Sequence, residues 1–225
     1  SGTIKRAVIA GGGFIGLEVA ENLQSRGIRT TVLDMLPHIM PGFDQEMAEY
    51  AENHLADQGI MTLLDTKLEG VEGNGTVEKV KTSRRAIKAD ALVLSLGIRA
   101  NTAFLADTGI ELAPNRTILV DDHMRTNDED IYALGDCSMI TNRMTHQRAW
   151  SPMGSSANIE GRIAAQNIAG GDVSYPGVLG TGVVKLPGLN AGRTGLTEQA
   201  AKDAGHDVVS VVAVVDDKAH YYPGA

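Results

Sequence analysis

The start of the chain consists of an apolar run, a glycine-rich turn, a helical pattern and a second apolar run, and this order predicts a βαβ unit. Residues 5–10 form a short β-branched and apolar run, and the glycine-rich stretch GGGFIG, residues 11–16, follows it. A helical pattern then continues to about Gly27, and the segment RTTVLD predicts a second short strand that ends at Asp34. The apolar face expected for this helix consists of Ile15, Val19 and Leu23.

A second helix is predicted over DQEMAEYAENHLADQGI, residues 44–60. Its expected buried face consists of Met47, Tyr50, Ala51, His54 and Leu55, and we interpret His54 as a residue at the edge of the core rather than a ligand. From about Met61 to Gly97 the period changes to two, and the turns EGNG and TSRR separate three β-rich segments. This pattern predicts an antiparallel meander that returns to the sheet through ALVLSLG.

The second half of the chain reads as shorter elements. Residues 101–110 are expected to form a helix or turn. Residues 117–137 are expected to form two short strands around an acidic loop, 127–130, which we interpret as a solvated turn. Residues 152–169 are predicted to form a helix rich in small residues, and the composition changes at the glycine pair 170–171. A short helix is predicted at 197–204 and a strand at 207–215.

The glycine loop carries the first candidate chemistry. Gly11, Gly13 and Gly16 satisfy the pattern G-x-G-x-x-G between a strand and a helix. The first glycine turns the chain sharply, the second lets a pyrophosphate approach the backbone, and the third allows helix and strand to pack closely. The helix N-terminus then supplies N–H donors and partial positive charge to the phosphates. This context predicts a dinucleotide site.

Asp34 indicates which dinucleotide binds. A carboxylate at the end of the second strand accepts hydrogen bonds from the ribose hydroxyls and repels a 2′-phosphate. No arginine follows Asp34 closely enough to hold such a phosphate, so the sequence predicts a preference for NADH over NADPH. The alternative is a surface carboxylate that merely ends a strand.

Composition narrows the partners. The chain has 225 residues and a formal net charge of −8, and its basic residues are scattered, which argues against nucleic acid and anionic membranes. No apolar run approaches the roughly 20 residues of a membrane span, and no signal peptide is evident, so we expect a cytoplasmic protein. The single cysteine, Cys137, excludes an internal disulfide and an all-cysteine metal site. No metal site is predicted.

Five segments together carry a family resemblance: GGGFIGLEVAENL, TTVLDMLPHIMPGFDQEM, LVLSLGIRANT, IYALGDCS and YYPGA. They resemble the FAD-dependent pyridine nucleotide-disulfide oxidoreductases, most closely the branch of coenzyme A disulfide reductases, NADH oxidases and persulfide reductases. The resemblance implies an α/β fold with a Rossmann-like NADH-binding domain (1–116), the C-terminal part of an FAD-binding domain (117–170) and the start of an α+β dimerisation domain (171–225). The flavin domain's N-terminal part would be absent, so a fragment of a larger homodimeric enzyme is expected.

The resemblance also implies the cofactors NADH and FAD and a set of residues that bind them. Asp136, in TNDEDIYALGD, would contact the flavin ribityl chain or a phosphate, at the end of a strand. Gly97 would lie at the junction of the NADH and flavin parts. The full set of cofactor-binding residues is Gly11, Gly12, Gly13, Phe14, Ile15, Gly16, Asp34, Met35, Gly97, Gly135 and Asp136.

The resemblance implies specific roles for Glu18, Phe14 and two tyrosines, and each role has a simpler alternative. Glu18 would hold the nicotinamide carboxamide, or be an ordinary exposed residue of the first helical turn. Phe14 would cover the flavin until nicotinamide displaces it, or simply pack. Tyr221 or Tyr222 would reach the substrate sulfur across a dimer, or be an interface aromatic. Relatives often carry Gln at the position of Glu160 and differ at 187–190. Cys137 is interpreted as a small packed residue without a redox role.

The implied activity of the parent enzyme is hydride transfer from NADH to FAD, then reduction of a disulfide, persulfide, coenzyme A disulfide or O₂. The alternatives are a ferredoxin-reductase-like or nitrite-reductase-associated flavoprotein without a redox cysteine, and a stand-alone NADH-binding module without activity. Because the family's redox cysteine is not in this sequence, we expect the chain alone to be inactive. We also expect residues 1–117 to fold by themselves and leave open whether the later residues do.

Overall fold

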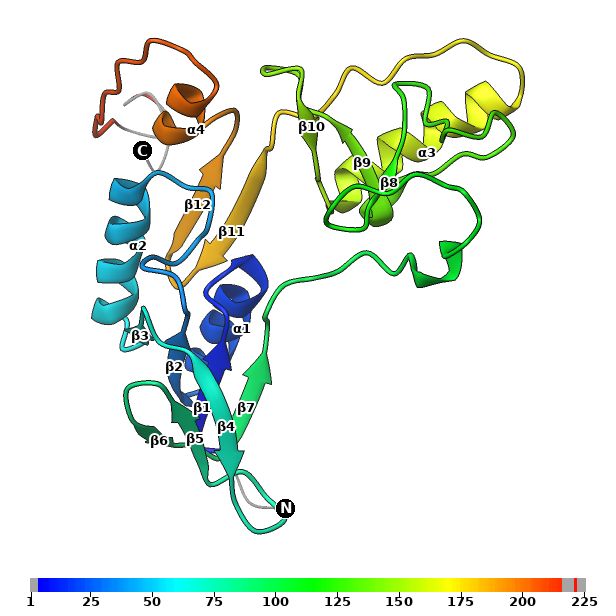
Figure 1. Cartoon of the computed structure of the whole chain (residues 1–225). Coiled ribbons are helices and arrows are strands. Elements are labelled where there is room, and N and C mark those ends of the chain that lie inside the picture. The colour runs from blue at the N-terminus through cyan, green and yellow to red at the C-terminus, as the bar shows by residue number, and fades with distance from the viewer. Residues whose placement is uncertain (1–3, 216–220, 222–225) are drawn as a thin grey trace. The chain divides into compact units, whose positions relative to one another are not determined.

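A computed structural model describes residues 4–215 and residue 221. Its first sheet contains four parallel strands in the order β3-β2-β1-β7 (Figure 1). They are β1 (Arg6–Ala10), β2 (Arg29–Leu33), β3 (Met61–Leu63) and β7 (Ala91–Leu94). Because β1 is joined to β2 through helix α1 (Phe14–Gln24), and β2 to β3 through helix α2 (Gln45–Asp57), the predicted βαβ unit is confirmed.

The two faces of this sheet have different covers. Alternate strand residues point to opposite faces: Ile9 and Val32 pack with α1 and α2 in the first core, whereas Val8 and Leu33 pack with Val80 on the other side. The second cover is the antiparallel sheet of β4 (Leu68–Glu72), β5 (Lys79–Thr82) and β6 (Ala86–Lys88). The predicted meander is therefore present, and the chain returns from it to pair β7 with β1.

The buried faces of the two helices agree only in part with those predicted: Ala51 and Leu55 of α2 are buried as expected. The residues that α1 and α2 bury fully are Gly16, Leu17, Ala20, Ala48, Ala51 and Leu55, whereas Ile15, Met47 and Tyr50 are exposed. Val19 and Leu23 pack only partly against the core. Leu17 and Leu55 are fully buried, and the glycine and alanine residues beside them let the helices approach the sheet closely.

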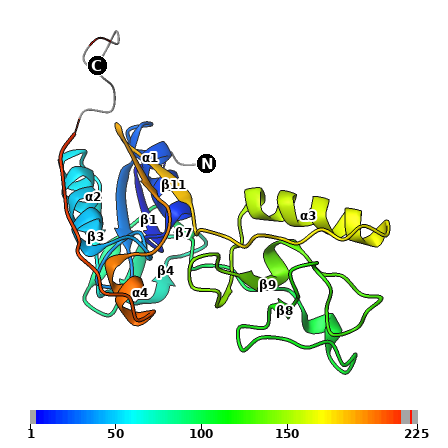
Figure 2. The same cartoon turned by 90° about the horizontal axis from the view of Figure 1, so that it is seen from above.

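A second core lies around residues 118–178. It combines β8 (Ile118–Leu119), β9 (Ser138–Thr141) and β10 (Arg148–Ala149) with helix α3 (Gly154–Ile168) and two short 3₁₀ turns, η1 (Ala103–Leu105) and η2 (Gly135–Cys137). In both views α3 lies along β8 and β9 (Figures 1 and 2). Nine buried residues, among them Ile140 and Ile163, form this core. The region after residue 117 therefore has a core of its own.

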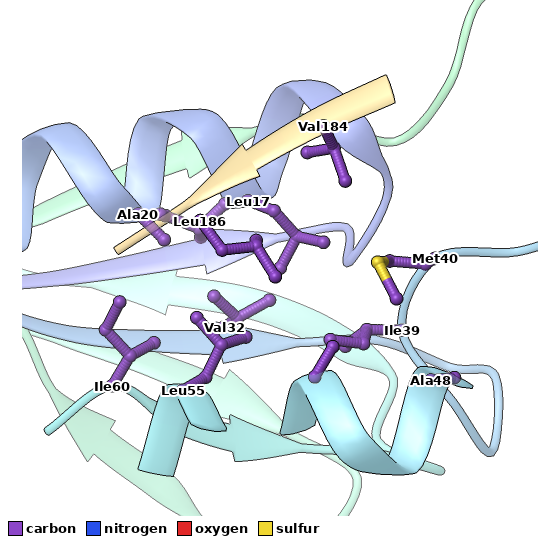
Figure 3. Packing of buried hydrophobic residues seen from close by; sticks show 12 residues of the cluster. Leu17, Ala20, Val32, Ile39, Met40, Ala48, Leu55, Ile60, Val184 and Leu186 are labelled. Atoms are coloured by element: carbon purple, nitrogen blue, oxygen red, sulfur yellow. The ribbon is translucent and has the colours of Figure 1, made fainter. Parts of the chain in front are cut away.

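A hairpin completes the first core. It consists of β11 (Gly182–Leu186) and β12 (Leu189–Arg193), and Val184 and Leu186 are fully buried beside Leu17 and Val32 (Figure 3). The turn between its strands is tied to α2, because the His54 ring bonds the carbonyl oxygen of Pro187. Sequence patterns gave no sign of this packing. The predicted domain boundaries after residues 116 and 170 stay predictions.

The chain divides into two compact units, residues 1–195 and 196–225. The second contains helix α4 (Glu198–Asp203), whose first turn is capped by the Thr197 hydroxyl, which accepts from the Ala200 amide at 3.1 Å. The strand predicted at 207–215 is wrong: these residues carry no strand, and Val209 and Val214 are 90% and 100% exposed. A β-branched run becomes a strand only beside a partner, and none pairs with it among the described residues.

Among the described residues, no helix combines the length and the apolar character that crossing a membrane requires.

Candidate functional site

The glycine loop joins β1 to α1, and two of its glycines are required by close backbone contacts. Gly11 has φ +114°, and a Cβ there would lie 2.0 Å from the Ser95 carbonyl oxygen. At Gly16 a Cβ would lie 2.0 Å from the carbonyl oxygen of Gly11. Around Gly13, in contrast, a Cβ would meet nothing within 4 Å. The loop is therefore tightly packed on its inner side and open where a ligand would approach.

The N-terminus of α1 faces this open side with its own donors. Gly13 is the N-cap residue and offers no side chain to the helix, and the first turn contains no acidic residue. The first N–H groups of a helix have no partner within the helix, and they carry partial positive charge. An anion such as a pyrophosphate fits this end.

Asp34 has a second role that sequence reasoning missed. Its Oδ2 accepts a hydrogen bond from the Gly12 amide at 2.6 Å, and its Oδ1 accepts from the Leu36 amide at 2.9 Å. The carboxylate therefore holds the glycine loop against the end of β2. Because an ionised carboxylate has about four acceptor positions, each oxygen keeps capacity for a ribose hydroxyl. The spacing of the motif suggested the ligand but not this internal contact.

The neighbouring predicted residues are placed as follows. Met35 and Ile15 are 69% and 65% exposed. Glu18 is exposed, and its carboxylate has no hydrogen bond or ion pair among the described residues. It is the fifth residue of α1 and therefore lies beyond the first turn. Gly97 follows β7 with φ +91° and open space around it.

Phe14 packs within the first unit. Its ring lies edge-on to Phe43, with centroids 5.9 Å apart, and a Cβ at Gly182 would lie 2.8 Å from the Phe14 ring. Arg193 of the hairpin covers the Phe43 ring at 5.9 Å and donates to the Gly42 carbonyl oxygen. This arrangement agrees with packing as the simpler interpretation of Phe14, and the role over a flavin stays a prediction.

The Gly135–Asp136 pair forms a second candidate site. It lies in η2, immediately before β9, so the expectation that it ends a strand is wrong: Gly135, with φ +79°, turns the chain into the strand instead. The Asp136 carboxylate is exposed and has no partner among the described side chains. Its backbone oxygen, however, accepts a hydrogen bond from the Trp150 indole at 2.9 Å.

Glu160 supports this turn from inside the core, and the sequence did not indicate that role. The residue is 1% exposed, and its Oε2 accepts from the Gly135 amide at 2.7 Å. Burial raises the pKa of the Glu160 carboxyl, although the hydrogen bonds from Gly135 and Ser138 act in the opposite direction. Sequence alone signalled only a Glu where relatives often have Gln.

Cys137 behaves as the small packed residue that the sequence suggested. Its thiol points to the Leu134 carbonyl oxygen at 3.5 Å, and burial raises the thiol pKa above its ordinary value. A thiol without a lowered pKa is a poor nucleophile. Of the two C-terminal tyrosines, Tyr221 is 83% exposed, and Tyr222 lies outside the described residues.

The chain is similar over nearly its whole length to several known proteins. The NAD(P)H sulfur oxidoreductase (CoA-dependent) of Pyrococcus furiosus is 35% identical over 98% of this chain and 50% of its own length. The NAD-dependent persulfide reductase from A. fulgidus superimposes with a TM-score of 0.91 and 37% identity, over 98% of this chain and 41% of its own.

An engineered water-forming NADPH oxidase bound to NADPH, derived from the NADH oxidase of Lactobacillus brevis, superimposes with a TM-score of 0.90 and 28% identity, over 98% of this chain and 49% of its own. The chain spans about half the length of the curated relatives it matches.

The family model of the pyridine nucleotide-disulphide oxidoreductases matches residues 2–154, which include both the glycine loop and the Gly135–Asp136 turn. The chain therefore belongs to the pyridine nucleotide-disulphide oxidoreductase family.

Proposed function

We propose that this chain binds NADH at the glycine loop and contributes the Gly135–Asp136 turn to an FAD site, as part of a flavoprotein oxidoreductase. The parent enzyme passes hydride from NADH to FAD and on to a disulfide, a persulfide, coenzyme A disulfide or O₂. The nicotinamide and the flavin supply the redox chemistry when bound. The relatives support this proposal by name, as sulfur oxidoreductases, persulfide reductases and NADH oxidases.

The observation that carries the nicotinamide half is the joint geometry of Gly12, Gly13 and Asp34. One carboxylate fixes the loop through the Gly12 amide and keeps acceptor capacity for ribose, while the space at Gly13 is open beside the helix N-terminus. The residues present thus fit an adenosine ribose next to a pyrophosphate. In this arrangement the chain binds and orients the dinucleotide.

The preference for NADH rests on charge. Asp34 places a negative charge where NADPH would carry its 2′-phosphate. The engineered NADPH oxidase supports this assignment, because its name includes the replacement of a glycine and, 18 positions later, of an aspartate. Gly16 and Asp34 have that same spacing in this chain.

The flavin half rests on Asp136. Its carboxylate is exposed and has no partner among the described residues, while Trp150 and Glu160 hold the turn around it by hydrogen bonds to the backbone. A fixed acceptor of this kind fits a hydroxyl of the ribityl chain. The homodimer, the contact of Tyr221 or Tyr222 with a substrate sulfur, and a cytoplasmic location belong to the proposal as well.

A ferredoxin-reductase-like flavoprotein without a redox cysteine is the second candidate for the acceptor step. Cys137, the single cysteine of this sequence, does not fit the role of a redox cysteine, because its thiol lies against the Leu134 carbonyl oxygen and burial raises the thiol pKa. The stand-alone NADH-binding module remains the alternative if no flavin binds to the parent protein.

Calorimetric titration with NADH and NADPH tests the nicotinamide half. Asp34→Ala should weaken NADH binding about tenfold or more, because hydrogen bonds to a charged group are lost. Asp34→Asn keeps an acceptor and removes the charge, so it should improve NADPH binding and thereby reduce the preference for NADH over NADPH. The control Glu69→Ala removes an exposed charge from β4. Equal NADH affinity in wild type and Asp34→Ala would sink the proposal.

A further inference from the structure

Glu160 is a buried carboxyl group with an uneven set of partners. Both of its hydrogen bonds go to Oε2, from the Gly135 amide at 2.7 Å and from the Ser138 hydroxyl at 2.9 Å. Its other oxygen, Oε1, is buried and has no hydrogen-bond partner in the part of the chain that the structure describes. Buried polar atoms are nearly always paired, so an unpaired carboxylate oxygen needs an explanation.

A proton on the Glu160 carboxyl group provides one, because it leaves Oε1 as an uncharged oxygen, which costs less free energy to bury than a charged one. The contacts of Ser138 show where this proton fits. The Ser138 hydroxyl lies 2.8 Å from the Gly135 carbonyl oxygen and 2.9 Å from Glu160 Oε2. A hydroxyl carries one proton and can donate to only one of these acceptors. If Glu160 is ionised, Ser138 donates to Oε2. If Glu160 holds a proton on Oε2, it donates to Ser138, and Ser138 donates to the Gly135 carbonyl oxygen.

Both arrangements leave the turn hydrogen-bonded. In each, Oε2 still accepts from the Gly135 amide, and the Ser138 hydroxyl keeps a partner. Glu160 therefore connects the residue before Asp136 with the residue that starts β9. From the other side, Trp150 holds the Asp136 carbonyl oxygen. The exposed Asp136 side chain, which has no partner among residues 4–215 and 221, thus lies on a turn that is fixed at both ends.

We propose that Glu160 is a positioning residue for the flavin contact: its protonatable carboxyl fixes the Gly135–Cys137 turn and thereby the orientation of Asp136. The inference rests on the proposed function, in which Asp136 meets FAD. The inference places a proton-binding group against the backbone of the residue that precedes Asp136. A neutral Gln at this position would hold the turn as well but could not exchange a proton.

The titratable groups that face Glu160 are Asp136 and Cys137 on the turn and Tyr175 after α3. Burial is the main cause that raises the pKa of Glu160, and the Asp136 charge adds to it; burial also raises the pKa values of Cys137 and Tyr175, and the Glu160 charge adds to both. None of these three neighbours can carry a positive charge that would stabilise the ionised form of Glu160. This environment favours the proton on Glu160.

The sole tryptophan, Trp150, is a built-in reporter for the test, because its indole donates to the turn. In the wild-type chain, tryptophan emission should titrate with a midpoint above 4.5, the ordinary value for Glu. Glu160→Gln should abolish this step, whereas Asp136→Asn and the exposed control Glu129→Gln should keep it. A wild-type titration that persists unchanged in Glu160→Gln would overturn the inference.

Amide hydrogen exchange of Gly135, followed by NMR, tests the positioning role itself. Glu160→Ala should speed the exchange about tenfold, because the amide loses its acceptor, and Glu160→Gln should restore it to within about twofold. Equal exchange in wild type and Glu160→Ala would contradict the role.

If Glu160→Ala does not fold, Ser138→Ala takes its place: without the hydroxyl, which lowers the Glu160 pKa, the emission step should move to higher pH. An unmoved step would contradict the inference. None of these measurements uses a flavin. Failure of FAD to bind the parent protein would therefore count against the proposed function alone, and the exchange data would still decide the role of Glu160.

Discussion

Replacing Leu186 by Ala tests whether the hairpin β11–β12 is part of the first core. Leu186 is fully buried among residues of the helices and the parallel sheet, next to Val184 (Figure 3). The change removes the isopropyl group, three buried carbon atoms, from this contact and leaves a cavity that a packed core fills only partly. Substitutions of this kind cost about 2–5 kcal/mol. We expect a value in the upper half of this range, because β11 packs directly on α1 and Leu186 belongs to the same buried cluster as Val32 of β2.

The same strand supplies a matched control. Val183 precedes Val184 on β11 and points to the opposite face, where it is 65% exposed. Val183→Ala should therefore change the free energy of unfolding by less than about 0.5 kcal/mol. Urea denaturation followed by circular dichroism gives both values. If Leu186→Ala cost no more than Val183→Ala, the hairpin would not pack on this core, and the account of the first unit would be wrong.

Three further changes have expected outcomes. Gly11→Ala should destabilise the chain by at least about 3 kcal/mol in thermal unfolding, since its Cβ would lie 2.0 Å from the Ser95 carbonyl oxygen at a positive φ. Asp90 has a pKa lowered to about 2, chiefly by its hydrogen bond from Arg6, so its contribution to stability is present above pH 3.8 and lost as the pH falls to about 2; Asp90→Asn should remove this loss in acid unfolding curves. The pKa of His123 is raised, mainly by hydrogen bonding to neighbouring aspartate carboxylates, so the contribution of His123 to stability is full below pH 6.5 and lost as the pH rises through the folded-state pKa. Unfolding curves of His123→Gln should lack this pH dependence, and the same pH dependence in the variant and the wild type would contradict the reasoning.

Much of the nucleotide-binding fold could be predicted from sequence because its signals are local. The glycine spacing, the strand before it and the helix after it lie within residues 6–24, and the structure arranges them as expected. Asp34 could be located for the same reason. The contact between Asp34 and the Gly12 amide could not, because sequence spacing does not show which backbone donors meet a carboxylate.

The remaining errors came from contacts between distant segments. On α2, Ala51 and Leu55 are buried as expected, but Tyr50, which was expected on the same face, is exposed. The valine-rich run at 207–215 suggested a strand, yet a strand needs a partner that local pattern cannot supply. Glu160 was noted only as a departure from relatives, since its burial depends on the packing of α3 against the Gly135–Cys137 turn.

NMR titration of the isotopically labelled chain with NADH tests the central claim most directly. Amide signals of Gly12, Gly13 and Phe14 should shift as NADH is added, and they should respond only weakly to the same concentration of NADPH, because the glycine loop holds the pyrophosphate beside Asp34. The Gly135 amide should stay unchanged in the same titration. If the loop amides did not respond to NADH, the glycine loop would not be the dinucleotide site, and the function proposed here would be wrong.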